Sequence, residues 1–221
     1  MAATVDFSAG GYRFLPGVFQ YSGGVAALSG HAIQRVRLRT LLPLKAGFER
    51  IERLIGEAGR PLTSFCACEL RSPAPFTEQG FRAFNESYVV TLQKWGLFDG
   101  KVNPVARSNV CPEIDPPPEP CFYAFSFTAA DADAAPSFVI AGSAETREGP
   151  GSYSERTIRH GETSPEACAR RRATCSARWS AGLRSSVSAG RTPRRRRSIP
   201  CATSIRSSPT RSCAAARRVP G

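Results

Sequence analysis

The chain has 221 residues, and its 30 Lys and Arg against 18 Asp and Glu give a formal net charge of +12. No segment approaches the roughly 18 apolar residues that a membrane-spanning helix needs, and the N-terminus has neither the basic region nor the apolar run of a signal peptide. Composition therefore predicts a cytoplasmic protein with no membrane partner. Without a secretory signal, its eight cysteines indicate reduced thiols rather than a disulfide framework.

The positive charge is concentrated at the C-terminal end. Residues 168–221 hold fourteen arginines and no Lys, Asp or Glu, whereas residues 1–147 carry fourteen basic and fourteen acidic side chains. The arginines stand among Ser, Ala, Pro, Gly, Thr and Cys, which have GC-rich codons. We interpret this segment as out-of-frame translation; the alternative is a disordered basic tail. Either origin predicts disorder there, and no specific binding of nucleic acid, because an arginine-rich tail binds it nonspecifically.

The frame hypothesis can be tested on the sequence itself. Residues 169–180 (ARRRATCSARWS) have a possible coding sequence that, read two bases later, gives EKARYVLGEME. That peptide has apolar residues three and four positions apart, as in an amphipathic helix. Residues 201–213, shifted in the same way, give RDIHPFLADEIV. Two sensible peptides at the same offset favour a frameshift over a natural basic tail.

The remaining chain has seven segments with the periodicity of regular structure. In chain order we predict a strand at residues 17–28, a strand at 32–39, a helix at 44–58, a strand at 64–70, a helix at 77–97, and strands at 105–111 and 121–128. The order β-β-α-β-α-β-β predicts an α+β fold, an antiparallel-leaning sheet with both helices on one face. The other face, with Val18, Val25, Ile33 and Val36, would then be open and favour self-association.

Side-chain spacing makes two of these predictions more specific. The helix at 77–97 aligns Phe81, Phe84 and Tyr88, which we assign to the core rather than to a stacking surface. On the strand at 64–70, Cys66 and Cys68 are two residues apart, so they are expected to share a face as packed thiols. We predict no metal site.

A second unit is predicted to begin after residue 135. Residues 138–149 repeat the opening pattern of an apolar strand that runs into a bend of small residues, and residues 164–166 (Ser-Pro-Glu) are typical of a helix start. The predicted organisation is one domain over residues 1–135, a fragment of a second copy over 136–167, and a disordered tail over 168–221.

Two motifs carry a resemblance to a known family. Phe84-Asn85 followed by Tyr88, and the segment at residues 103–110 (NPVARSNV), resemble the F-N-x-x-Y helix and P-x-R-S-x-V strand of the Rid family, the YjgF-like reactive-intermediate deaminases. The resemblance implies trimers with active sites between subunits and hydrolytic deamination of 2-imino or 2-enamino acids without a cofactor. A tandem gene product would resemble the two-domain 2-aminomuconate deaminases of aromatic-ring degradation.

The same resemblance gives the candidate site. Arg107 would hold the carboxylate of a small substrate, since a guanidinium can bind both carboxylate oxygens. Family deaminases have an acid in the last strand to orient water; the nearest acid here is Glu119, so we take it as the second catalytic candidate. Tyr21 and Ser22, at the bend after the first strand, are candidate substrate-binding residues. Alternatively, Arg107 is a surface residue paired with Glu113 or Glu119.

Three functions remain open on the sequence alone. The first is a deaminase of the 2-aminomuconate type, active in the intact gene product and impaired in this chain. The second is a chorismatase-like lyase on a paired Rid-like scaffold. The third is a non-catalytic module that binds small acids.

Overall fold

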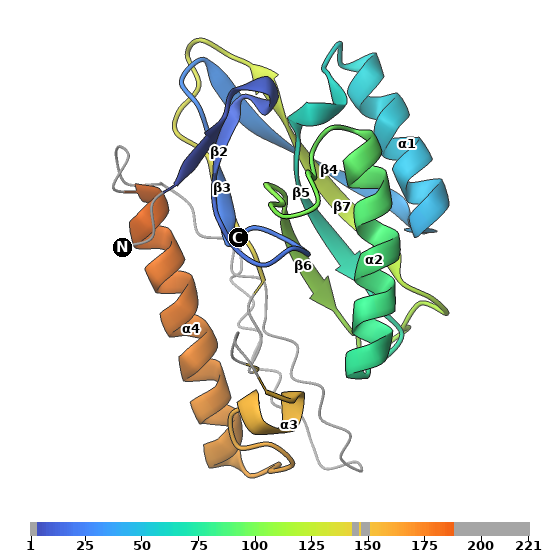
Figure 1. Ribbon diagram of the computed structural model, residues 1–221, viewed down its shortest axis with the longest axis vertical. Coiled ribbons are helices and arrows are strands. Elements are labelled where there is room, and N and C mark those ends of the chain that lie inside the picture. Colours follow the sequence, from blue (N-terminus) through green and yellow to red (C-terminus); the bar gives the residue numbers. More distant parts are fainter. Residues whose placement is uncertain (1–3, 143–145, 147–150, 188–221) are drawn as a thin grey trace, which may run out of the picture.

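The computed structural model describes residues 4–142, 146 and 151–187 (Figure 1). Within these residues the chain forms two four-stranded sheets and four α-helices, which confirms the α+β class. The tail beyond residue 187 and most of the bend predicted at 143–149 lie outside the described residues. In the described part, no helix combines the length and the apolar character needed to cross a membrane.

Four of the predicted strands form one sheet in the order β4-β7-β5-β6. These strands are β4 (His31–Pro43), β5 (Phe65–Arg71), β6 (Ala106–Val110) and β7 (Cys121–Ala130). Neighbours are antiparallel except β5 and β6, which are parallel and are joined by a crossover helix. The sequence predictions of strands at 32–39, 64–70, 105–111 and 121–128 are confirmed.

Helices α1 (Leu44–Glu57) and α2 (Glu78–Lys94) cover one face of this sheet (Figure 1). Both were predicted from apolar residues three and four positions apart, and both are confirmed. Thr77 caps α2, since its hydroxyl accepts a hydrogen bond from the Gly80 amide at 3.0 Å. The main core lies between the helices and the sheet. Its largest buried side chains are Phe48, Ile51, Ile55, Phe65, Leu70, Tyr88, Leu92, Trp95, Phe122 and Phe125.

A second sheet, which the sequence did not predict, lies against the other face. Its strands are β1 (Val5–Phe7), β2 (Tyr12–Leu15), β3 (Gly24–Ala27) and β8 (Phe138–Ile140), all antiparallel, in the order β1-β2-β3-β8. Tyr12, Phe14 and Val25 pack there against Cys66, Ala67 and Ala106 of β5 and β6. The face expected to be open is therefore partly covered, and Val25 is only 1% exposed.

The strand predicted over residues 17–28, with an interruption at Gly23-Gly24, is wrong in extent. Only Gly24–Ala27 are in β3, and residues 17–23 form a loop with two isolated bridges, one of them from Ser22 to Ala106. The loop arises because Gly23 and Gly24 interrupt the alternation before β3, and a Cβ at Gly24 would lie 2.9 Å from the Val139 carbonyl oxygen of β8. This loop brings Tyr21 and Ser22 to the edge of the larger sheet.

The expectation that Cys66 and Cys68 share a face is also wrong. The pairing of β5 with β7 shifts between Phe65 and Ala67, so the strict alternation of the strand is broken. Cys66 consequently packs in the cluster between the sheets, whereas Cys68 packs under the helices. The Cys68 sulfur lies 3.2 Å from the Tyr88 hydroxyl on the helix side.

The chain after β7 adds to the first domain. β8 pairs with β3 and completes the smaller sheet. Two helices follow, α3 (Tyr153–Arg156) and α4 (Pro165–Val187), and α4 packs against β2, β3 and β8 (Figure 1). The helix start predicted at 164–166 is confirmed, because the Ser164 hydroxyl accepts from the Ala167 amide at 3.2 Å.

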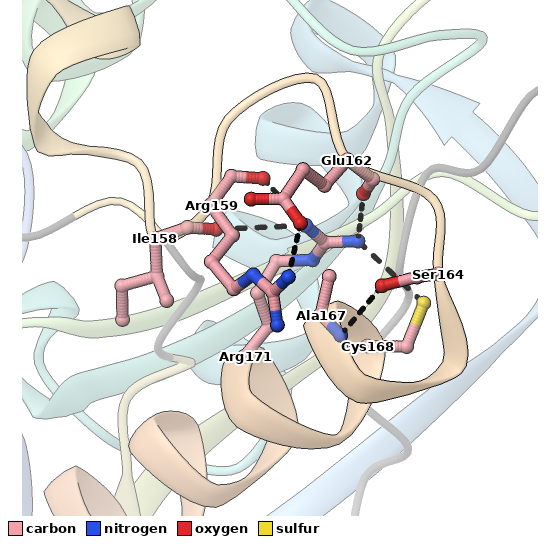
Figure 2. Close-up of polar contacts among 7 residues, drawn as sticks. All are labelled: Ile158, Arg159, Glu162, Ser164, Ala167, Cys168 and Arg171. Atoms are coloured by element: carbon pink, nitrogen blue, oxygen red, sulfur yellow. Dashed lines mark hydrogen bonds and ion pairs between the residues drawn. The ribbon is translucent and has the colours of Figure 1, made fainter.

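The structure differs from the expectation of disorder over residues 168–187, which it describes as helix. Alanine and arginine, which dominate this segment, both have high helix propensity. Figure 2 shows how one arginine fixes the helix to the preceding loop. Arg171, 6% exposed, donates to the carbonyl oxygens of Arg159 and Glu162 at 3.0 and 2.9 Å, and to that of Ile158 at 3.5 Å.

Arg171 provides a test of how α4 is held. We expect Arg171→Ala to lower the free energy of unfolding by about 2–3 kcal/mol, because it leaves buried carbonyls without a donor. Arg172→Ala, on an exposed neighbour in the same helix, should change stability little. Thermal melts followed by circular dichroism would measure both, and equal effects of the two substitutions would contradict the role of Arg171.

The two buried thiols of β5 provide a second test. Burial raises the pKa of Cys66, and it raises the pKa of Cys68 to about 11. Since the thiolate is the reactive form, we expect both to resist iodoacetamide at pH 8 in the folded protein and to react after unfolding. Cys111, which is only half-buried, should react first. Peptide mass mapping would show the order, and equal labelling of all three in the folded chain would refute it.

Candidate functional site

Arg107 lies on β6, at the edge of the larger sheet, and is 3% exposed. Its strand begins where the Asn103 side chain accepts from the Val105 amide at 3.0 Å and donates to the Phe19 carbonyl at 3.2 Å. The backbone amide of Ser22 donates to the Val105 carbonyl at 2.8 Å. These bonds hold the loop at residues 17–23 beside β6, so that the loop and the arginine strand form one rigid edge.

The guanidinium of Arg107 points towards α2, where it meets one polar and several aromatic side chains. Its Nη2 donates to the Asn85 Oδ1 at 2.6 Å. The guanidinium carbon lies 4.8–6.0 Å from the centres of four aromatic rings. These rings belong to Tyr21, Phe81, Phe84 and Tyr88. Aromatic faces attract a cation but cannot accept a full hydrogen bond from every N–H group.

Asn85 is itself held in place, and so it orients the arginine. It is fully buried, and its Nδ2 donates to the Phe81 carbonyl at 2.6 Å, one turn earlier in α2. That bond leaves its oxygen directed at Arg107. Tyr88, one turn later, has its hydroxyl beside the Cys68 sulfur, and burial raises the pKa of this phenol. One face of α2 therefore supplies four contacts to the arginine, from Phe81, Phe84, Asn85 and Tyr88.

A second nitrogen of the guanidinium, Nη1, has no hydrogen-bond partner among the described residues. Nη1 of Arg107 is buried and makes no hydrogen bond, and the described residues contain no ion pair between Arg107 and a carboxylate. A buried cation without a counter-ion is costly, because it has lost its hydration. An anion that enters this site gains a charge-assisted hydrogen bond and removes that cost. The arrangement is therefore suited to a small carboxylate.

The other predicted site residues have different positions. The Tyr21 ring lies 5.2 Å from the Arg107 guanidinium carbon. Ser22 is next to it but fully buried, with its hydroxyl directed to the Gly24 carbonyl at 3.4 Å, so it holds the loop. Glu69, on β5, is bound to Arg35 through two hydrogen bonds of 2.5 and 3.0 Å.

Glu119 is not brought to Arg107 within this chain. It is exposed in the loop before β7, and Cys121, two residues later, pairs with Arg71 of β5. Arg107 pairs with Cys68, three residues earlier on the same strand. The two positions are therefore separated by about 10 Å or more along the strand direction.

Sequence reasoning missed the aromatic surroundings of the arginine. It assigned the line of Phe81, Phe84 and Tyr88 wholly to the core, but Phe81 and Phe84 are half-buried and face Arg107. The available signal was the polar Asn85 inside that apolar line, which a packed core would not need. Among the described residues, no group of three or more His, Cys, Asp or Glu is placed to hold a metal ion.

Comparison with known proteins gives the family. Residues 4–184 match the family model described as 2-aminomuconate deaminase CnbZ. A 2-amino-5-chloromuconate deaminase from Comamonas testosteroni is 50% identical over 168 residues, which is 75% of this chain and 67% of the relative. No solved structure matches the chain. Both matches include the arginine strand and the helix that contacts it, and on this evidence the chain belongs to the 2-aminomuconate deaminase CnbZ family.

Proposed function

We propose that this chain is a deaminase of 2-aminomuconate-type acids and that Arg107 binds the carboxylate next to the amino-bearing carbon. The observation that carries the proposal is the buried Nη1 of Arg107, which has no hydrogen-bond partner among the described residues. The named activities of the matching family and relative supply the substrate class. These substrates are flat, conjugated six-carbon chains with a carboxylate at each end.

The chemistry requires water, not a redox cofactor. The enamine form of the substrate tautomerises to the imine, water adds to the carbon of the C=N bond, and the C–N bond then breaks. Ammonia leaves and the carbon becomes a carbonyl. The Arg107 guanidinium would hold the adjacent carboxylate, and the rings of Tyr21, Phe81 and Phe84 would lie along the conjugated chain.

The water needs a group that accepts or donates a proton within hydrogen-bond reach. We keep Glu119 as the proposed acid, supplied by a neighbouring copy rather than by the same chain. This follows the arrangement of Rid-like proteins, whose sites lie between subunits, and it agrees with the exposure of Glu119 in the loop before β7. The trimer and the Rid-like architecture are parts of this proposal.

A second candidate is a module that binds small acids without turnover. It is favoured by one observation, the separation of Glu119 from Arg107 within the chain. Ammonia release from 2-aminomuconate distinguishes the two functions, because a binding module would bind the acid and release none. The lyase alternative has no support from the family match.

We also propose that the gene encodes a longer, tandem product and that the residues after about 167 are read out of frame. The arginine excess and the two shifted peptides support this. Helix α4 is compatible with either frame, because both ARRRATCSARWS and its shifted counterpart EKARYVLGEME are helix-forming sequences. Resequencing the gene around codons 166–169 tests the proposal directly, and an unchanged sequence together with the predicted mass of the expressed chain would end it.

Substitution of Arg107 tests the carboxylate site. We expect Arg107→Ala to fold but to raise the Kd for muconate about 30-fold or more, because the charged partner is gone. Arg107→Lys should recover little, since an ammonium cannot bind both carboxylate oxygens. Arg82→Ala, on the exposed face of α2, is the matched control. Titration calorimetry and ammonia release would measure the effect, and normal turnover by Arg107→Ala would refute the assignment.

Substitution of Asn85 tests why Arg107 needs an external anion. We expect Asn85→Asp to weaken muconate binding more than Asn85→Ala, because the new carboxylate would pair with Arg107 and compete with the ligand. Alanine only removes the residue that orients the guanidinium. Binding at pH 7 in both variants would give the comparison. Equal losses would show that Asn85 acts through packing alone.

A further inference from the structure

A groove lies at the edge of the larger sheet that is opposite to Arg107. It has a volume of about 410 Å³ and is lined by six residues of β4 and two of α1, the helix that follows β4 directly in the chain (Figure 1). Because β4 and β6 are the outer strands of this sheet, three strand spacings, about 14 Å, separate the groove strand from the strand of Arg107. The groove is therefore separate from the candidate site.

The floor of the groove is apolar and continuous with the main core. Leu38 belongs to that core, and Val36, Leu42 and Leu54 pack against it while they remain partly exposed. The pairing of β4 with β7 shifts in register between Arg37 and Leu42. Such an irregularity bends a strand locally, which agrees with the opening of the groove at this part of β4.

Three arginines line the same groove, and its lining includes no acidic residue. Arg37 and Arg39 come from β4, and Arg50 comes from α1. Within the part of the chain that the structure describes, none of the three forms an ion pair. The Arg37 guanidinium carbon lies 5.0 Å from the centre of the Tyr123 ring, which attracts a cation but does not neutralise it. The groove thus combines an apolar floor with an excess of positive charge.

The neighbouring sequence explains why these charges are not neutralised. The positions three and four residues from Arg50, which are its neighbours on the helix surface, are not acidic. They hold Ala46, Gly47, Arg53 and Leu54. Glu69, the carboxylate that binds a β4 arginine, is held by Arg35 through hydrogen bonds of 2.5 and 3.0 Å. Residues 188–221 include no Asp or Glu, so their side chains offer the groove no carboxylate.

We propose that the groove between β4 and α1 binds a small organic acid with an apolar body, at a site separate from Arg107. The arginines bind the carboxylate, since a guanidinium donates two parallel charge-assisted hydrogen bonds to it. The aliphatic side chains of the floor cover the hydrocarbon part of the ligand. The groove volume of about 410 Å³ lies within the roughly 300–1,000 Å³ that is usual for small-molecule sites. An inorganic anion would use the charges alone, so both parts of the groove together define the ligand.

Octanoate is a suitable probe because it joins one carboxylate to an alkyl chain. We expect it to bind the full chain with a Kd of about 1 mM or lower. In an NMR titration of the isotope-labelled chain, the amide signals that shift should be those of residues 36–42, 50 and 54. Acetate and 1-octanol each lack one of the two parts, so both should bind about fivefold more weakly or worse.

Substitutions on α1 test the contribution of the charges. Arg50→Gln should raise the octanoate Kd about fivefold or more. Arg53→Gln, on an exposed position of α1 outside the groove, is the matched control and should leave that Kd unchanged. Arg107→Ala should also keep the groove shifts, because its strand lies at the other edge of the sheet. Circular dichroism melts of each variant would confirm that the chain is folded.

Three results would overturn the proposal. The first is the absence of saturable octanoate shifts in the groove, and the second is equal affinity for octanoate and 1-octanol. The third is an equal loss of affinity in Arg50→Gln and Arg53→Gln, which would show a general effect of charge. None of them bears on the proposed deaminase site, which the muconate titrations of Arg107→Ala test separately.

Discussion

A buried guanidinium that keeps its charge at every physiological pH is the constraint on which the site depends. Arg107 is 3% exposed, and among the described residues it contacts one hydrogen-bond acceptor and four aromatic rings. This environment compensates only part of the lost hydration. An anionic ligand would therefore lower the free energy of the buried cation. The fold keeps the cation in place because both its strand and the helix opposite are fixed.

Two features of the chain make this placement rigid. The crossover from β5 through α2 to β6 sets Asn85 opposite Arg107, because parallel neighbouring strands require a helix to return along one face of the sheet. The loop at residues 17–23 then closes the edge of β6 through the Ser22 amide. The geometry around Arg107 therefore depends on backbone pairing rather than on flexible side chains, as preorganised binding requires.

Local periodicity was sufficient to predict the helices and the strands of the larger sheet, because their side chains alternate or repeat within a few residues. It missed β1 and β2, which are short and pair locally with each other and with β3. It could not predict that β8 joins them in a separate sheet, since that pairing links residues more than a hundred positions apart. It also missed the break in β5 that separates Cys66 from Cys68, because a bulge is a property of the strand pair. In the candidate site, the position of Arg107 on a strand was predictable from its motif, whereas its contacts with the rings of Phe81 and Phe84 were not.

The described residues contain two buried charged side chains, Arg107 and Arg171. The two differ in how far the protein pairs their N–H groups with hydrogen-bond acceptors. Arg171 donates to three backbone carbonyls and so has a structural role, although the composition of its segment predicted a solvated tail. Arg107 has a single acceptor and a buried nitrogen without one. Burial alone does not mark a functional arginine, since both are equally hidden from water. We base the proposed role of Arg107 on its unpaired nitrogen rather than on its burial, because an anionic ligand would give that nitrogen a hydrogen-bond acceptor.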